Sequence, residues 1–249
     1  MSLIDFHVHI DYYKDFNEKF NFYNNNKIYA LCVTNLPEIY EKCICNFNES
    51  KYVKFALGYN PQFAGTDKFS RKKFDEYFDT TKYIGEVGLD FSKDFITHKA
   101  EQIEVFDYIA KKSGQHNKIL SIHSRNAENE VISILKMNKV KFAVFHWYTG
   151  NIDKIKEIID LGYYFSVNSK LLQSKRGLNI IKSIPLDRIL IETDGPFTDF
   201  KKPTIFPENL SEVYALFSQT LNVIGFNHSF FSHCQGGIIS NPFYRIVIS

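Results

Sequence analysis

The feature that most constrains the fold is an alternation of short apolar segments with amphipathic ones along most of the chain. Runs rich in β-branched and aromatic residues, such as Ile28 to Val33, are typical of buried strands. Between such runs, apolar residues recur at helical spacing, as Ile155, Ile158 and Ile159 do. We predict strands over residues 3–8, 28–34, 52–58, 83–87, 118–123, 141–146, 163–167 and 188–192, and helices over 98–112, 126–138, 151–161 and 208–222.

Eight strands with intervening helices in 249 residues match the size and strand count of a (β/α)8 TIM barrel. An open doubly wound sheet is the competing arrangement, but the chain has no GxGxxG or GxxxxGK[ST] loop to favour it. No linker rich in Gly, Pro or Ser divides the sequence, so we predict one domain over residues 1–249. Residues 223–249 lack a clean period and fit either an irregular cap or a poorly ordered tail. Helix 126–138 opens with Asn126 and has Glu128 near its start, which suits the helix dipole.

Composition excludes some classes of protein and leaves others open. The 30 basic and 28 acidic residues give a net charge of +2, which does not by itself indicate nucleic acid but allows a local basic patch. The four cysteines form no CxxC pair, so we expect free thiols in a reducing compartment. Because no signal peptide and no apolar run of about 20 residues is visible, we predict a cytoplasmic protein that does not enter the membrane.

Potential metal ligands stand at or just past the ends of several predicted strands. His7 and His9 share one face of the first strand, because strand side chains alternate with a period of two. Later strands end close to four further imidazole or carboxylate side chains: Glu86, His123, His146 and Asp194. Taken singly, each of these has an ordinary structural explanation, such as a core histidine, a buried ion pair or a helix cap. Together they predict one site, because strand ends converge at one end of a barrel.

The types of these side chains indicate the kind of site. Neutral imidazoles and carboxylates bind zinc, manganese and similar divalent ions. Four histidines with a glutamate and an aspartate are too many for a single tetrahedral zinc that keeps an open position. The set suits two ions about 4 Å apart that share a carboxylate, activate a water and stabilise both oxygens of a displacement.

The motifs that carry these residues resemble those of the TatD family of metal-dependent deoxyribonucleases, in the amidohydrolase superfamily. The resemblance covers roughly residues 1 to 220 and rests on five segments: Phe6 to His9, Gly85 to Asp90, Ile122 to Arg125, His146 to Gly150, and Glu192 to Phe197. The His-Trp and Glu-Thr-Asp-Gly-Pro-Phe forms are similar to the QatD subgroup, a component of bacterial Qat anti-phage systems.

The resemblance implies a (β/α)8 barrel of the metal-dependent hydrolase type with two divalent metal ions, for which Zn, Mn and Mg are the candidates. His7, His9 and Asp194 would hold one ion, and His123 and His146 the other. Glu86 would bridge the two. Asp194 would also orient the attacking water and take its proton, so Glu86 and Asp194 are the expected catalytic residues.

Five further residues are expected to contact the substrate. Arg125 stands where the family often has a basic residue, and its fork suits a phosphate. Asn60 precedes Pro61 where the family usually has a histidine; its amide can bond a phosphate oxygen but cannot donate a proton near neutral pH. Trp147 and Tyr12, along with Tyr148, could stack on bases.

The leading functional hypothesis is hydrolysis of DNA phosphodiesters at single-stranded ends, in the 3′ to 5′ direction, as part of anti-phage defence with other Qat proteins. Two alternatives remain open. The same site could cleave another small ester or amide, or the chain could be a weakly catalytic, metal-bearing subunit of a defence complex, which Asn60 favours. All of these require His7 and His146 to lie within about 10 Å of each other.

Overall fold

A computed structural model gives the structure of residues 3–47, 50–199 and 204–221, and the predicted tail at 223–249 lies outside these ranges. The strands are β1 (Ile4–Val8), β2 (Tyr29–Val33), β3 (Val53–Ala56), β4 (Tyr83–Asp90), β5 (Ile119–Arg125), β6 (Phe142–His146), β7 (Tyr164–Val167) and β8 (Ile189–Ile191). The α-helices are α1 (Phe16–Asn25), α2 (Pro37–Asn46), α3 (Arg71–Tyr77), α4 (Lys99–Gln115), α5 (Glu128–Met137), α6 (Asp153–Asp160), α7 (Lys175–Ser183) and α8 (Leu210–Thr220). The short 3-10 helices are η1 (Ile10–Tyr12), η2 (Pro61–Phe63), η3 (Phe78–Thr80), η4 (Ile96–His98), η5 (Ser169–Gln173), η6 (Leu186–Arg188) and η7 (Pro207–Asn209).

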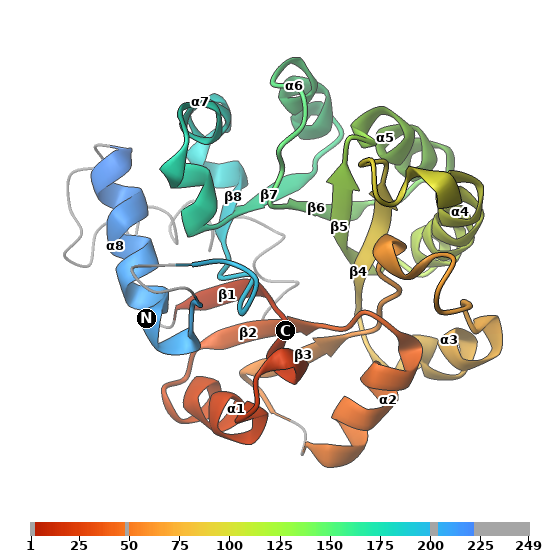
Figure 1. The fold of residues 1–249 in the computed structure, drawn as a ribbon, viewed down its shortest axis with the longest axis horizontal. Helices are drawn as coiled ribbons and strands as arrows, with labels where there is room; N and C mark the ends of the chain where they lie inside the picture. The colour runs from red at the N-terminus through yellow and green to blue at the C-terminus, as the bar shows by residue number, and fades with distance from the viewer. Residues whose placement is uncertain (1–2, 48–49, 200–203, 222–249) are drawn as a thin grey trace.

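The strands form a ring with the helices outside it (Figure 1). All ladders are parallel, in the order β1-β2-β3 and β4-β5-β6-β7-β8. The first gap between these sheets is closed where the Gly85 N–H donates to the Leu57 carbonyl at 3.0 Å. The second is closed just past β8, where the Asp194 N–H donates to the His7 carbonyl at 2.8 Å. The predicted (β/α)8 barrel is therefore confirmed.

Every predicted strand is present, with ends that differ by a few residues, and β4 extends to Asp90 rather than ending at residue 87. The helices predicted at 98–112, 126–138, 151–161 and 208–222 correspond to α4, α5, α6 and α8. The predicted helix start at Asn126 is two residues too early. The N-cap of α5 is Ala127, and Asn126 has a φ of +54°, a left-handed conformation that asparagine tolerates better than most residues.

The core has two layers. A smaller cluster inside the barrel takes buried side chains from all eight strands: Ile4, Phe6, Leu31, Val33, Ala56, Tyr83, Ile119, Val144, Tyr164 and Leu190. A larger cluster fills the space between the outer faces of the strands and the helices. On β5, Ile119 faces the interior whereas Leu120 and Ile122 belong to the outer layer, as the alternation of strand side chains requires.

Two irregular ladders decide which side chains enter the barrel. The β1–β2 register shifts after Asp5, and the β4–β5 register shifts after Ile84. Phe6 packs in the interior cluster, so strict alternation would turn His7 outward toward the helices. The shift instead brings His7 to the inside, and the shift in β4 does the same for Glu86. Bulges of this kind re-aim side chains next to functional sites.

The glycines beside Glu86 allow close approach of β5. A Cβ at Gly88, whose φ is +138°, would lie 2.0 Å from the carbonyl oxygen of His123. A Cβ at Gly85 would lie 2.8 Å from the Cβ of Ser121. The two strands that carry Glu86 and His123 can therefore pack at ordinary ladder distance only because these positions lack side chains.

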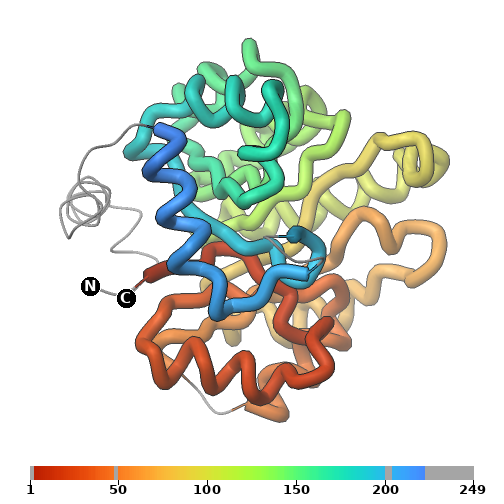
Figure 2. The backbone as a smooth tube through the Cα atoms, turned by 60° about the vertical axis from the view of Figure 1, so that its left-hand side comes forward, coloured from red at the N-terminus to blue at the C-terminus, as the bar shows by residue number. Residues whose placement is uncertain are grey.

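The last described helix returns to the first strand. Figure 2 shows α8 running beside the start of the chain, and the Tyr214 hydroxyl there donates to the Ile4 carbonyl at 2.9 Å. Within the described ranges, no helix combines the length and the apolar character needed to cross a membrane. Cys32, Cys43 and Cys45 are free thiols, as predicted, and Cys234 lies outside the described residues.

Candidate metal centre

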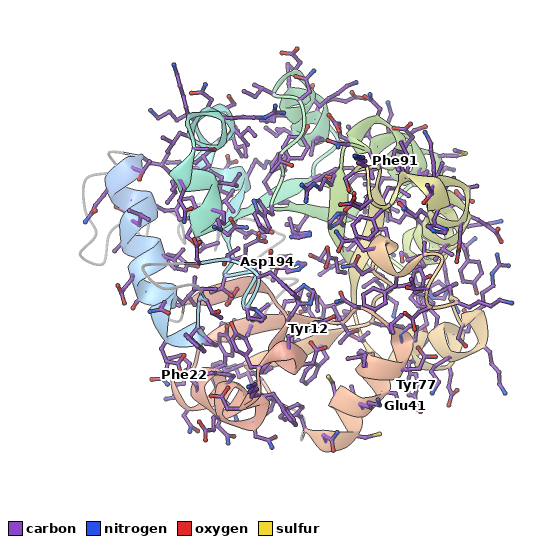
Figure 3. All side chains as sticks on the ribbon, in the orientation of Figure 1. Tyr12, Phe22, Glu41, Tyr77, Phe91 and Asp194 are labelled. Atoms are coloured by element: carbon purple, nitrogen blue, oxygen red, sulfur yellow. The ribbon has the colours of Figure 1, made fainter. Side chains whose placement is uncertain are left out.

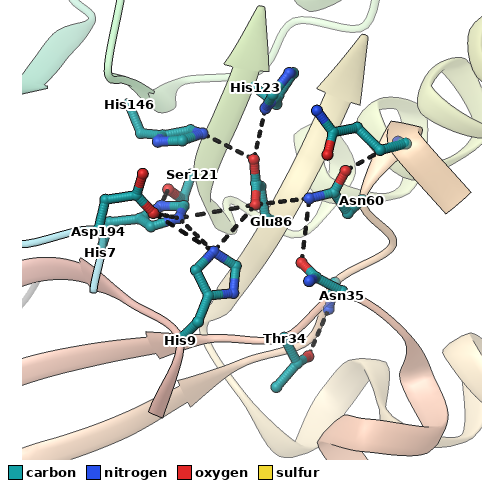
Figure 4. A network of polar contacts seen from close by, with 12 residues as sticks. His7, His9, Thr34, Asn35, Asn60, Glu86, Ser121, His123, His146 and Asp194 are labelled. Carbon is teal, nitrogen blue, oxygen red and sulfur yellow. Dashed lines mark hydrogen bonds and ion pairs between the residues drawn. The ribbon is translucent and has the colours of Figure 1, made fainter. Parts of the chain in front are cut away.

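The six predicted ligands converge at the carboxyl-terminal ends of the strands (Figure 4). His7 lies in β1 and His9 directly after it, whereas Glu86, His123 and His146 lie in β4, β5 and β6. Asp194 follows β8, the strand that neighbours β1. The rings of His7 and His146 stack with centroids 3.9 Å apart, well inside the limit of about 10 Å that a shared metal centre requires.

One cluster consists of His7, His9 and Asp194. The Nε2 atoms of the two histidines are 3.2 Å apart, and Asp194 Oδ1 lies 3.6 Å from His7 Nε2 and 3.7 Å from His9 Nε2. Glu86 Oε2 adjoins the same atoms, at 3.3 Å from His9 Nε2 and 3.8 Å from His7 Nε2. Four ligand-type atoms thus surround one point.

The second cluster uses the other oxygen of the same carboxylate. Glu86 Oε1 lies 2.6 Å from His123 Nδ1 and 2.8 Å from His146 Nε2. The two oxygens of Glu86 therefore face different pairs of imidazoles, which is the arrangement that a bridging carboxylate adopts. His146 also belongs to a third possible group, with His7 and Glu192.

These donors fit divalent cations better than they fit one another. Ligand atoms about 2.1 Å from a zinc ion lie roughly 3 to 3.5 Å apart, close to the separations in the first cluster. Two imidazole nitrogens 3.2 Å apart can bond each other only if one carries the hydrogen, and a cation between them would satisfy both lone pairs. Among the described residues, the buried His9 Nδ1, His146 Nδ1 and Glu192 Oε2 have no hydrogen-bond partner, but these are not the atoms that face the two clusters.

Burial and mutual charge shift the protonation equilibria in the cluster. Burial raises the pKa of Asp194 to about 7, against the opposing effect of His146 and His9. Burial also disfavours ionised Glu86, but the charge of His146 and hydrogen bonds from the surrounding imidazoles outweigh it and hold the pKa of Glu86 well below its usual range. Burial, reinforced by His146, lowers the pKa of His7. Glu86 is thus a carboxylate and His7 neutral, the forms in which both can bind a cation. Burial lowers the pKa of His9, His123 and His146, but the carboxylates beside them outweigh it and raise that pKa, so a cation would displace protons from these rings.

Comparison with known proteins assigns the family. The sequence family described as TatD related DNase matches residues 4–224. The chain belongs to this family. Solved structures with the same barrel include a TatD homologue from Escherichia coli K12, with a TM-score of 0.77 and 20% identity over 88% of this chain and 90% of that one. A TatD-family hydrolase from Entamoeba histolytica gives a TM-score of 0.73 at 17% identity, covering 90% of this chain and 92% of that one.

Curated relatives match over shorter segments. The "3'-5' ssDNA/RNA exonuclease TatD" of Klebsiella pneumoniae is 32% identical over 119 residues, which is 46% of this chain and 45% of that protein. The "Deoxyribonuclease Tat-D" of Schizosaccharomyces pombe is 33% identical over 121 residues, 47% of this chain and 39% of its own. The chain thus spans about half the length or less of these TatD relatives.

Several side chains around the TatD-family site orient the candidate ligands. Ser121 Oγ lies 2.8 Å from His7 Nδ1, and Asp90 Oδ2 lies 2.8 Å from His123 Nε2. Hydrogen-bonded outer partners of this kind fix the tautomer and ring orientation of a metal-bound histidine. Glu192 Oε1 stands 3.9 Å from His146 Nδ1, too far for a hydrogen bond, and acts on that ring as a nearby charge. These three side chains were not among the predicted site residues, although Asp90 could have been found, because it stands four residues after Glu86 on the same face of β4.

Replacing Asp90 by asparagine should weaken metal binding. In the wild type, the negative charge of Asp90 favours a proton on His123 Nε2, which leaves His123 Nδ1 unprotonated on the side of Glu86. The isosteric amide keeps the shape of the side chain but removes this charge. We expect about 10-fold lower zinc affinity in a chelator competition. Asp94→Asn is the matched control, since Asp94 is exposed in the following loop. Equal affinities for Asp90→Asn and the wild type would contradict this role.

The predicted substrate residues have different environments. Arg125 is exposed at the end of β5, two residues beyond His123, and Trp147 is partly buried and packs against the core. Tyr12 is 44% exposed and its ring lies 5.7 Å from that of His9. Tyr148 is buried, and its hydroxyl donates to the Asn151 carbonyl, so this ring is part of the core rather than a stacking surface.

Asn60 belongs to the candidate site in a way that the sequence did not predict. Its side-chain amide donates to Glu86 Oε2 at 2.8 Å and to Asn35 Oδ1 at 3.2 Å (Figure 4). Both amide hydrogens therefore have acceptors within the site, and Asn60 orients Glu86. A phosphate contact by this amide would have to replace one of these two bonds.

Proposed function

We propose that this chain is a metal-dependent deoxyribonuclease that hydrolyses phosphodiester bonds at single-stranded DNA ends. The observation that carries the proposal is the Glu86 carboxylate, buried between two groups of imidazoles with one oxygen directed to each. That arrangement suits a pair of divalent cations, which would lower the pKa of a water and polarise a phosphoryl oxygen. Membership of the TatD related DNase family supports a phosphodiester as the substrate.

Each side chain of the candidate site would have its own role. His7, His9 and Asp194 would hold one cation, His123 and His146 the other, and Glu86 both. Asp194 would accept a proton from the attacking water, as a buried carboxylate beside the metal centre can. Arg125, exposed at the mouth of the barrel, would bind a phosphate of the strand through its fork. Trp147 and Tyr12 would contact bases.

The finer biological assignment rests on the motifs alone. The His146-Trp147 pair and the Glu192 to Phe197 segment have the forms that resemble the QatD subgroup. We therefore propose a role in anti-phage defence, with other Qat proteins as partners. The cytoplasmic location stays a prediction.

The test is release of nucleotides from a 3′-labelled single strand in manganese or magnesium. We expect the wild type to be active and His123→Ala to be at least about 100-fold slower, because a ligand of the second cluster is lost. His98→Ala is the control, since His98 is exposed in η4.

A panel of small esters and amides tests the alternative substrate, and activity there without DNA cleavage would replace the proposal. A wild type inert on every substrate would favour a non-catalytic subunit.

A further inference from the structure

Two exposed aromatic rings stand beside the candidate metal centre. Six large apolar side chains are exposed in the described part of the chain, and Tyr12 (44%) and Phe197 (50%) are the aromatic ones among them. Their ring centroids are 4.9 Å apart, and the Phe197 ring lies 5.0 Å from that of His9. They are far apart in the sequence, because one comes from η1 after β1 and the other from the segment after β8. Figure 3 shows Tyr12 and Asp194 toward the centre of the ring of strands.

Both rings are held in place by the site itself. The Tyr12 hydroxyl accepts a hydrogen bond from the Asn35 amide at 2.9 Å, and the Asn35 oxygen accepts one from Asn60, which also donates to Glu86. Phe197 is fixed by a turn in which its N–H donates to the Asp194 carbonyl at 2.9 Å. Exposed rings that are already ordered lose little conformational entropy on binding a ligand.

The rings meet edge to face, with an interplanar angle of 66° between Tyr12 and Phe197 and 79° between Phe197 and His9. This packing fixes their orientation without stacking one ring flat on another. In a DNA strand, the flat, uncharged π-system next to a phosphodiester is a nucleobase. An unpaired base that is splayed from its neighbours offers its faces to a protein ring, whereas a base inside a duplex has both faces covered by its neighbours. Phe197 has no polar atom with which to select one base over another.

We infer that Tyr12 and Phe197 form a stacking subsite for the unpaired base next to the phosphate at the metal centre, and that this subsite makes the site favour single strands. The inference rests on the proposed function and extends it by assigning Phe197 to the base subsite beside Tyr12 and by making this pair of rings the source of the preference for single strands. Stacking of this kind tolerates every base, because each has a π-face.

Binding of two fluorescein-labelled ten-mers tests the subsite without cleavage. One is dT10, and the other carries the same phosphates on tetrahydrofuran abasic sugars, so the two differ only in their bases. In calcium chloride we expect the wild type to bind dT10 about 10-fold more tightly than the abasic strand. Phe197→Ala and Tyr12→Ala should lose this preference, whereas Phe197→Tyr should keep it. Leu186→Ala is the control, since Leu186 is exposed in η6 before β8, at the other end of the barrel.

The outcomes test the stacking subsite separately from the proposed nuclease activity. A wild type that binds both strands equally, or binds neither, overturns the subsite, and so does a Phe197→Ala variant that retains the preference. Cleavage supplies the second measurement. Removal of a terminal thymidine should be faster than removal of a terminal abasic sugar, with the difference mainly in KM and absent in Phe197→Ala. If cleavage is absent but the binding preference follows Phe197, the nuclease proposal fails and the base subsite stands.

Discussion

Glu86→Gln is expected to abolish most of the nuclease activity, by at least about 10³-fold, and to leave the protein with fewer metal ions per chain. The substitution keeps the shape of the side chain but replaces one carboxylate oxygen with an amide nitrogen, which donates hydrogen bonds and cannot bind a cation. Because the two oxygens face different groups of imidazoles, either orientation of the amide removes a ligand from one cluster. The measurements are metal content of the purified protein and the rate of nucleotide release.

The matched control is Glu104→Gln, a surface glutamate paired with Arg71. It should retain wild-type rate and metal content. Far-UV circular dichroism and thermal unfolding would verify that Glu86→Gln is folded. A Glu86→Gln protein with full metal content and near wild-type rate would contradict the bridging role.

Asp194→Asn is expected to slow the reaction by about 10² to 10⁴-fold and to change its dependence on pH. Only the ionised carboxylate can accept a proton. Burial raises the pKa of Asp194 to about 7, so the group is largely protonated below that value, and the wild-type rate should rise with pH along an acidic limb. A cation bound beside the carboxylate favours its charged form, which places this limb at or below neutrality.

In Asp194→Asn the acidic limb should disappear, because an amide does not titrate there. The variant should keep at least one metal ion per chain, since the cluster of Glu86, His123 and His146 is unchanged. Asp160→Asn, which affects an exposed ion pair with Lys156, is the control and should leave the pH profile unaltered. An acidic limb that persists in Asp194→Asn would assign the proton acceptor to another group.

The strands and the class of fold could be predicted from sequence because the determining signals are local. A run such as Ile119 to Ile122 is apolar enough to be a buried strand wherever it lies, and its neighbours along the chain have helical periodicity. Asn126 shows the limit of such signals. It has the side chain of a good helix cap, but its backbone is left-handed and α5 begins two residues later.

The candidate ligand residues could be predicted from the sequence, but several of the contacts around them could not. His7, Glu86 and Asp194 stand near or just past the ends of the predicted strands, so their convergence follows from the barrel. The contact between Asn60 and Glu86 joins residues from different loops and strands, and no periodicity predicts it. The same is true of Phe197, whose position beside Tyr12 depends on the closure of β8 against β1.

The sequence by itself determined the eight strands, the barrel and the residue types gathered at its mouth, because strand and helix periods are properties of short segments. The tertiary structure decided which faces of β1 and β4 point inward. Phe6 fills the barrel interior, so alternation alone would have left His7 among the helices, and only the register shift against β2 reverses this. Register is set by pairing with a neighbouring strand, which is a non-local interaction, and one shifted residue moves every following side chain to the other face of the sheet.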